Sequence, residues 1–297
     1  MRLFLESVGF GISAGALISL AAVGFTIQFG ISNVLNISYG PTLTLSAYLG
    51  YLLVLAHVNV WLTVALIGAA MGILSVLYNR LFITPLSHRG GGFVGVIIGT
   101  VGAGIIIQFA ITLIAGPSTF SYGRQAGRSV FFLDMVFSVT QIILIGIAVV
   151  AMIVYHLLLT RTQLGRGMRA TANNAMLAQA CGIRTQRIID FAWLISGFLC
   201  GVGGVALAIT TVSFDFSLGT TFLIYVIAAA VLGGIGQPYG AMLGGLVVGI
   251  GSQVAGTYTS PAYQDVVALG LLVLLLLVKP TGLFSSGTAG ARTLAQG

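Results

Sequence analysis

Charge is what this sequence has least of. Its 297 residues include 12 Lys and Arg, 5 Asp and Glu and 3 His, so only 6% of the chain is charged, whereas a soluble domain is about 25% charged. Residues 7–79, 135–160 and 216–264 contain no Asp, Glu, Lys or Arg at all. A bilayer core takes about 20 apolar residues per helix. The sequence therefore predicts an all-α polytopic membrane protein, with residues 1–297 forming a single transmembrane domain.

Several kinds of site are missing as well. The only lysine, Lys279, is followed by Pro280, whereas an ATP-binding P-loop needs Gly-Lys before Ser or Thr. Any ATP that drives this protein must therefore bind to another subunit. Cys181 and Cys200 fit neither a metal-ligand spacing nor a disulfide framework, and we expect both to be small apolar fillers. We predict no catalytic residue, no metal and no cofactor in this chain. Despite a net charge of +7, no basic stripe alternates with aromatic residues, which excludes a nucleic-acid partner.

Apolar runs predict nine membrane spans. Eight is the alternative, because the second span is short and only Gln237 and Pro238 separate the seventh from the eighth. No Asp, Glu, Lys or Arg falls deep in any span, which disfavours a proton-driven transporter. Sodium coupling through carbonyl and hydroxyl groups stays open. The predicted spans are 8–30, 40–56, 60–82, 93–115, 136–159, 189–211, 219–236, 239–257 and 264–279.

The loop at about 161–188 is the most basic stretch, with five arginines and no acid between residues 161 and 187. If this loop is cytoplasmic, nine of the twelve basic residues face the cytoplasm, as the positive-inside rule requires. Asp190 is then the single cytoplasmic acid. The other residues placed inside are Arg80, Arg89, Lys279 and Arg292, and those placed outside are Arg2, Glu6, Arg124, Arg128, Asp134, Asp215 and Asp265. One interpretation of the arginines is that they only anchor this topology.

The loop also has an order that charge alone does not explain. Asn173 and Asn174 are good N-cap residues, a run of small and apolar residues follows, and Gly182 stands where a helix would stop. The helix so predicted has two turns and carries Met176 and Leu177. Such a helix cannot bury these side chains by itself. It is therefore expected to dock into a groove of another protein.

A polar segment interrupts the apolar sequence between the first two spans. Residues 32–42 read SNVLNISYGPT, with two asparagines, a tyrosine and a Gly-Pro pair. Non-helical backbone at membrane depth occurs only where it is buried in protein or lines a watery cavity. The segment is therefore either an interfacial loop or a broken, re-entrant segment beside a solute path. The polar side chains that we place on such a path are Asn33, Asn36, Ser38, Tyr39, Thr42 and, from span 93–115, Gln108.

Glycine is abundant, with 42 residues, and many of them recur at a spacing of four within the spans. Such pairs let membrane helices approach closely, so a tightly packed bundle is expected. A second glycine-rich stretch at 233–240 is a candidate counterpart of the break at 32–42. The spaced pairs are Gly11/Gly15, Gly95/Gly99, Gly197/Gly201, Gly240/Gly244 and Gly245/Gly249.

Three stretches resemble the permease subunits of bacterial ATP-binding-cassette (ABC) importers for branched-chain amino acids, the LivH-like family. The first is GFTIQFG at 24–30, followed by NVLNISYG at 33–40. The second, LGRGMRA at 164–170 with Gly-Ile at 182–183, is the most specific. The third is the glycine-rich block VLGGIG…GAMLGG at 231–245. Together they extend over nearly the whole chain.

The resemblance implies a multi-pass protein of the bacterial inner membrane with several partners. These are a homologous permease subunit, usually a different chain, two ABC ATPase subunits that bind ATP, and an extracytoplasmic binding protein that delivers a small solute. The loop after the fifth span would carry the coupling helix that contacts the ATPase. The residues that we assign to coupling are Arg166, Arg169, Met176, Leu177, Gly182 and Arg184.

The chain departs from this family at one place. Where the family often has Phe and His before the glycine at position 40, this chain has Ile37, Ser38 and Tyr39. Relatives of the family also carry urea, short amides and small carboxylic acids, so the resemblance does not fix one solute. The alternative function is a stand-alone channel or ion-coupled carrier for a small solute. A membrane enzyme is a third class, for which the sequence offers no catalytic cluster.

Overall fold

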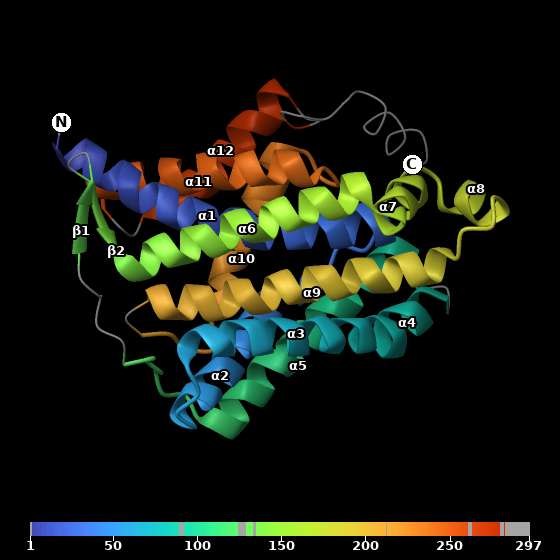
Figure 1. Ribbon diagram of the computed structural model, residues 1–297, viewed down its shortest axis with the longest axis horizontal. Helices are drawn as coiled ribbons and strands as arrows, with labels where there is room; N and C mark the ends of the chain where they lie inside the picture. The colour runs from blue at the N-terminus through green and yellow to red at the C-terminus, as the bar shows by residue number, and fades with distance from the viewer. Residues whose placement is uncertain are drawn as a thin grey trace. The chain divides into compact units, whose positions relative to one another are not determined.

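The computed structural model describes residues 2–88, 92–123, 129–132, 135–211, 213–260, 263–279 and 282, and most of them are helical (Figure 1). The helices are α1 Arg2–Ser32, α2 Tyr39–Leu55, α3 Val60–Tyr78, the π-helix η1 Asn79–Ile83, α4 Thr84–His88, α5 Gly92–Ala115, α6 Val139–Arg161, α7 Gln163–Asn173, α8 Ala175–Ala180, α9 Thr185–Thr210, α10 Leu218–Gly233, α11 Pro238–Tyr258 and α12 Gln264–Val278. The strands in the described residues are β1 Ser129–Phe132 and β2 Met135–Ser138, which form one antiparallel hairpin.

The prediction of a helical polytopic membrane protein is confirmed. Among the described residues, six helical stretches are long and apolar enough to cross a bilayer, and two shorter helices, α10 and α12, are also apolar. The count of eight or nine spans stays a prediction, as does the orientation. Of the charged residues used for the orientation, Arg89, Arg124, Arg128, Asp134 and Arg292 lie outside the described residues. The six stretches are Leu3–Ser32, Val60–Ser87, Gly92–Ala115, Val139–Arg161, Thr185–Thr210 and Pro238–Tyr258.

The chain folds into two compact units. Unit 1 takes the described residues within 1–26, 126–149 and 223–297, and unit 2 those within 27–125 and 150–222. Because α1, α6 and α10 each contribute residues to both units, neither unit is a contiguous sequence domain. The prediction of a single transmembrane domain stays a prediction.

Unit 1 is held by glycines that bring helix backbones together. A Cβ added at Gly11 would lie 2.7 Å from the Cα of Ile250, and one at Gly15 would lie 3.0 Å from the Cα of Leu246. From the opposite helix, Gly245 and Gly249 face α1 in the same way. The first and last of the predicted glycine pairs thus form the two sides of one contact between α1 and α11.

The corner between α10 and α11 uses the pair Gly240/Gly244. A Cβ at Gly240 would collide with the backbone of Gly233, and one at Gly244 with the carbonyl of Ala229. The residues between the two helices include Gly234 at φ 106° and Gly236 at φ 88°, a region that only glycine adopts readily. The second helix break predicted from the sequence is therefore present.

Unit 2 is built around α9, which packs most extensively against α3 and next against α2. Figure 1 shows α3 and α9 side by side along most of their length. A Cβ at Gly197 would lie 2.5 Å from the carbonyl oxygen of Met71, and one at Gly201 would lie 2.8 Å from the Cα of Gly68. This pair is also confirmed as a close helix contact.

The remaining pair, Gly95/Gly99, does not form a close helix contact among the described residues. A Cβ at Gly95 would meet nothing within 4 Å, and one at Gly99 would meet chiefly the side chain of Leu86. Spacing alone does not make a packing ridge when that face of the helix has no neighbouring backbone.

Candidate functional site

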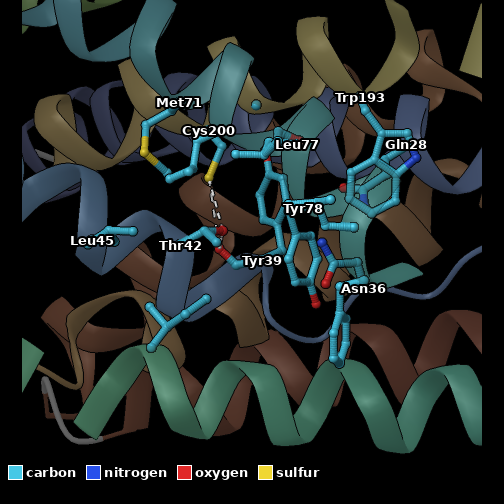
Figure 2. A pocket seen from close by; sticks show the side chains of 16 residues that line it. Gln28, Asn36, Tyr39, Thr42, Leu45, Met71, Leu77, Tyr78, Trp193 and Cys200 are labelled. Atoms are coloured by element: carbon cyan, nitrogen blue, oxygen red, sulfur yellow. Dashed lines mark hydrogen bonds between the residues drawn. The ribbon is translucent and has the colours of Figure 1, made fainter. Parts of the chain in front are cut away.

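Unit 2 has a partly open cavity of about 330 Å³ between the end of α1 and helices α2, α3, η1, α5 and α9. Its wall is largely apolar, with a few uncharged polar groups and no Asp, Glu, Lys or Arg (Figure 2). Ligand pockets range upward from about 300 Å³, so this one suits a small solute. The lining residues are Gln28, Asn36, Tyr39, Thr42, Leu45, Met71, Leu74, Ser75, Leu77, Tyr78, Leu81, Phe82, Ile107, Trp193, Gly197 and Cys200.

The polar break between α1 and α2 contributes Asn36 to the wall of this cavity. Residues 33–38 are not helical, and Asn36 and Ser38 are 4% and 0% exposed. Ser38 Oγ donates a hydrogen bond to Asn36 Oδ1 at 2.5 Å, and its distance to the hydroxyl oxygen of Tyr78 is 3.1 Å. Asn36 and Ser38 are thus buried in protein and hydrogen-bonded, whereas Asn33 at the start of the break is exposed.

The six residues predicted for a solute path therefore separate into groups. Asn36, Tyr39 and Thr42 line the cavity, whereas Ser38 does not line it and is hydrogen-bonded to Asn36. Asn33 is exposed with φ 52°, and neither it nor Gln108 is among the lining residues. Ile107, the residue beside Gln108, reaches the cavity instead.

Sequence patterns missed the contribution of α9. Trp193, Gly197 and Cys200 line the cavity, and they follow one another at intervals of four and three, as residues on one helix face do. Cys200 is buried as expected, but it is not a mere filler. Its Sγ lies 3.5 Å from Thr42 Oγ1, and Figure 2 shows the two side chains facing each other. The prediction for Cys181 is wrong, because this residue is exposed.

Gln28 was also missed, although an amide in an apolar span is a signal that could have found it. Its side chain is 1% exposed and lines the cavity. Ser196 Oγ of α9 donates to Gln28 Oε1 at 3.2 Å. Within the described residues no group of three or more His, Cys, Asp and Glu side chains is placed to hold a metal ion.

The basic loop folds as two helices, of which only the second was predicted. In α7, Gly165, Gly167, Met168 and Thr171 are buried, and a Cβ at Gly165 would collide with the carbonyl oxygens of the α6 C-terminus. The intervening residues Arg166 and Arg169 are exposed. The glycines at positions 165 and 167 lower the helix propensity of this stretch, and no helix was predicted from the sequence at residues 163–173.

The second helix, α8, forms where it was expected. Asn174 is its N-cap and accepts a hydrogen bond from the Leu177 N–H at 3.0 Å. Gly182, at φ 83°, follows its end. Met176 and Leu177 are 83% and 62% exposed, so this helix presents two large apolar side chains. Figure 1 shows α8 beyond the end of α9, at the extremity of unit 2.

The arginines of the loop differ in what they contact. Arg169 Nη1 donates to the carbonyl oxygen of Leu159 at 2.6 Å and so caps the C-terminus of α6. Arg169 therefore has a structural partner within this chain. Arg166 and Arg184 are exposed on α7 and at the N-cap of α9. All six residues predicted for coupling are exposed, and their role stays a prediction.

Similar proteins are known for nearly the full length of the chain. LivH of Escherichia coli (strain K12), a high-affinity branched-chain amino acid transport system permease protein, is 29% identical over 295 residues, 94% of this chain and 95% of that protein. BraD of Pseudomonas aeruginosa, which carries the same description, is 29% identical over 297 residues, with the same coverage. The ribose import permease protein RbsC of Haemophilus influenzae is 26% identical over 298 residues, 89% of this chain and 90% of that protein. No solved structure matches this chain.

A family model described as "Branched-chain amino acid transport system / permease component" matches residues 7–276. That range includes the cavity, the basic loop and both helix breaks. The chain therefore belongs to the branched-chain amino acid transport system permease family.

Proposed function

We propose that this chain is the permease subunit of an ATP-driven importer that moves branched-chain amino acids or a related small polar solute across the bacterial inner membrane. The observation that carries the proposal is a pairing of two features in unit 2. One is an uncharged cavity sized for a small solute. The other is an exposed helix with two apolar side chains at the end of the same unit.

The cavity favours a solute that is small and partly apolar. Seven of its sixteen lining residues are Leu, Met, Phe or Ile, and its polar groups are hydroxyls, amides, a thiol and an indole. Such a wall solvates an aliphatic side chain without binding it tightly, and a few polar groups fix its orientation. Because the permeases similar to this chain include one for ribose, the family alone does not restrict the solute to amino acids.

ATP would act through other subunits. The sequence has no P-loop, and Met176 and Leu177 on α8 form an apolar contact surface of the kind that inserts into a partner's groove. We propose two ABC ATPase subunits as that partner, with Arg166 and Arg184 as flanking polar contacts. A homologous permease, in most systems of this kind a different chain, and an extracytoplasmic binding protein would complete the importer.

The double substitution Met176→Asp and Leu177→Asp tests this function. Two carboxylates cannot be buried in an apolar groove without a large desolvation cost, so we expect the ATPase to stop co-purifying and L-leucine uptake by cells to fall to background. Because both positions are exposed, membrane insertion and yield should stay normal. Gln163→Asp with Ala172→Asp is the matched control, since it adds the same charge at exposed sites of α7.

The alternative function makes the opposite prediction. A stand-alone channel or ion-coupled carrier would transport L-leucine in liposomes that contain this chain and no ATPase. Uptake under those conditions, or normal uptake by the doubly substituted chain, would contradict the proposed function.

A further inference from the structure

A buried acid joins α9 to η1 close to the basic loop. Asp190 Oδ2 accepts hydrogen bonds from Arg80 Nη2 at 2.6 Å and Nε at 3.1 Å. Its other oxygen, Oδ1, lies 3.4 Å from Asn79 Nδ2 and 3.5 Å from Gln186 Nε2. We name these four side chains the Asp190 clasp. A carboxylate held by a two-pronged guanidinium and two amides has a strongly defined position.

The clasp is asymmetric in its exposure. The side chain of Asp190 is 10% exposed, whereas that of Arg80 is 62% exposed. Water can therefore replace Arg80, but the carboxylate left behind stays largely out of water and needs another partner. An ion pair of this kind has a closed arrangement and an open one of higher free energy.

The clasp continues directly into the wall of the cavity. One turn beyond Asp190, Trp193 lies with its ring centroid 6.0 Å from that of Tyr78, the residue that precedes Asn79. The Tyr78 hydroxyl is 3.1 Å from Ser38 Oγ, and Ser38 donates to Asn36 Oδ1. Trp193, Tyr78 and Asn36 all line the cavity. Through these contacts and the adjoining backbone of α9 and η1, the ion pair is linked to the wall of the cavity.

The element on the other side of the clasp has an unusual backbone. Asn79 and Arg80 belong to the π-helix η1, in which the Thr84 N–H donates to the Asn79 carbonyl. Such turns hold one more residue than an α turn and are frequent at functional sites. A change from the π to the α register would rotate Asn79 and Arg80 around the helix by roughly 100°. Ile83 of η1 and Trp193 share one apolar cluster, so such a change would also reach Trp193.

We propose that the Asp190 clasp is a positioning element that couples the basic loop to the cavity. This inference rests on the proposed function. The loop ends at Arg184, and α9 begins with the next residue, so movement of α8 acts on the first turns of α9. With the clasp closed, that movement is passed through Trp193 and Tyr78 to the polar break that lines the cavity. With the clasp open, the loop moves without changing the cavity.

The experiment uses the assembled importer, with its ATPase subunits, sister permease and binding protein, reconstituted in liposomes with L-leucine as the probe. Arg80→Gln and Asp190→Asn each remove the ion pair, and the second keeps the shape of the side chain. We expect both to lower the leucine transported per ATP hydrolysed by about tenfold, which is within the usual range of coupling between sites. The ATPase rate and the assembly of the complex should stay close to those of the wild type.

Arg80→Lys and Arg187→Gln are the controls. Lysine keeps the charge at position 80, so most of the coupling should return. Arg187 is an exposed arginine in the first turns of α9, which also carry Asp190. Its loss should leave the ratio of leucine transported to ATP hydrolysed unchanged. An unchanged ratio in both Arg80→Gln and Asp190→Asn would overturn the proposal. So would a loss of uptake that only follows a loss of assembled complex, because that outcome indicates a structural role.

A second measurement separates this proposal from the proposed function. The chain has two tryptophans, so in a Trp61→Phe background the emission comes from Trp193 alone. In the isolated chain we expect Arg80→Gln to shift that emission and Arg187→Gln to leave it unchanged. The absence of a shift would refute the link from clasp to cavity, even if the ATPase binds. If the wild-type chain bound no ATPase and transported L-leucine without one, the proposed function would be refuted. The Trp193 emission would still test the link between the clasp and the cavity.

Discussion

The two helix breaks of this protein are built in different ways. The break between α1 and α2, in unit 2, is stabilised by side chains: Asn36 and Ser38 bond each other, and Thr100 of α5 bonds the backbone on both sides of Asn36. The break between α10 and α11, in unit 1, is stabilised by backbone hydrogen bonds and by glycines at positive φ. Only the first lines the cavity.

This difference separates a recognition element from a structural corner. Buried polar side chains in a membrane protein carry a desolvation cost, and they are retained where they contact a solute or another polar group. Glycines carry no polar side chain and serve mainly to let two helices meet closely. The break at residues 33–38 should therefore be sensitive to polarity, and the break at residues 234–237 to volume.

The largest effect is expected from Gly233→Val. A Cβ at this position would collide with the backbone of Gly240 and Ala241, and backbone atoms cannot move aside as a side chain can. We expect loss of the folded protein, measured as the monodisperse fraction after detergent extraction, because overpacking of this kind exceeds the usual cost of about 1–3 kcal/mol. Gly270→Ala is the control, since a Cβ there meets nothing within 4 Å. Normal yield of Gly233→Val would show that the corner is not limited by volume.

Much of this arrangement could be predicted from the sequence, for physical reasons. Runs without charged residues indicate which segments are apolar helices. The polar residues at 32–42 indicate a break, because unpaired polar groups are costly in a membrane. The short helix α8 was predicted from its cap and its stop, which depend on neighbouring residues only. Four of the five glycine pairs lie at close helix contacts.

The rest depended on contacts between distant segments. Nothing near Trp193 or Cys200 in the sequence indicates that they face Tyr78 and Thr42, because helix spacing gives a face but not its neighbour. Asp190 looked like a lone acid beside a basic loop, and its partner Arg80 lies 110 positions away. The extra helix α7 was missed because Gly165 packs against the end of α6 and Gly167 against Ile188 of α9, and these tertiary contacts override the low helix propensity of glycine.

Asn36→Leu tests the polar break and is expected to have an intermediate effect. Leucine has a similar size but leaves Ser38 without the acceptor that it now bonds at 2.5 Å, which should lower the free energy of unfolding by about 1–3 kcal/mol. Because Asn36 lines the cavity, L-leucine uptake should fall by more than the amount of folded protein does. Asn33→Gly is the control: residue 33 is exposed at φ 52°, so glycine should preserve both fold and uptake. Equal effects at positions 33 and 36 would contradict the division of the path residues made above.

The smallest effect is expected from Thr100→Val, which tests the same break from its far side. Thr100 Oγ1 accepts from the Ile37 N–H at 3.3 Å and is 3.3 Å from the Leu35 carbonyl oxygen, so valine removes a bridge to the break while filling the same space. The Ile37 N–H is then left without this acceptor, which should cost about 1 kcal/mol in unfolding measured by SDS titration in mixed micelles. Thr112→Val on the same helix is the matched control, because the Thr112 hydroxyl bonds only the carbonyl of Gln108 in its own helix. If both substitutions cost the same, the hydroxyl of Thr100 contributes nothing to the break, and the distinction between a side-chain break and a glycine break would rest on Asn36 and Ser38 alone.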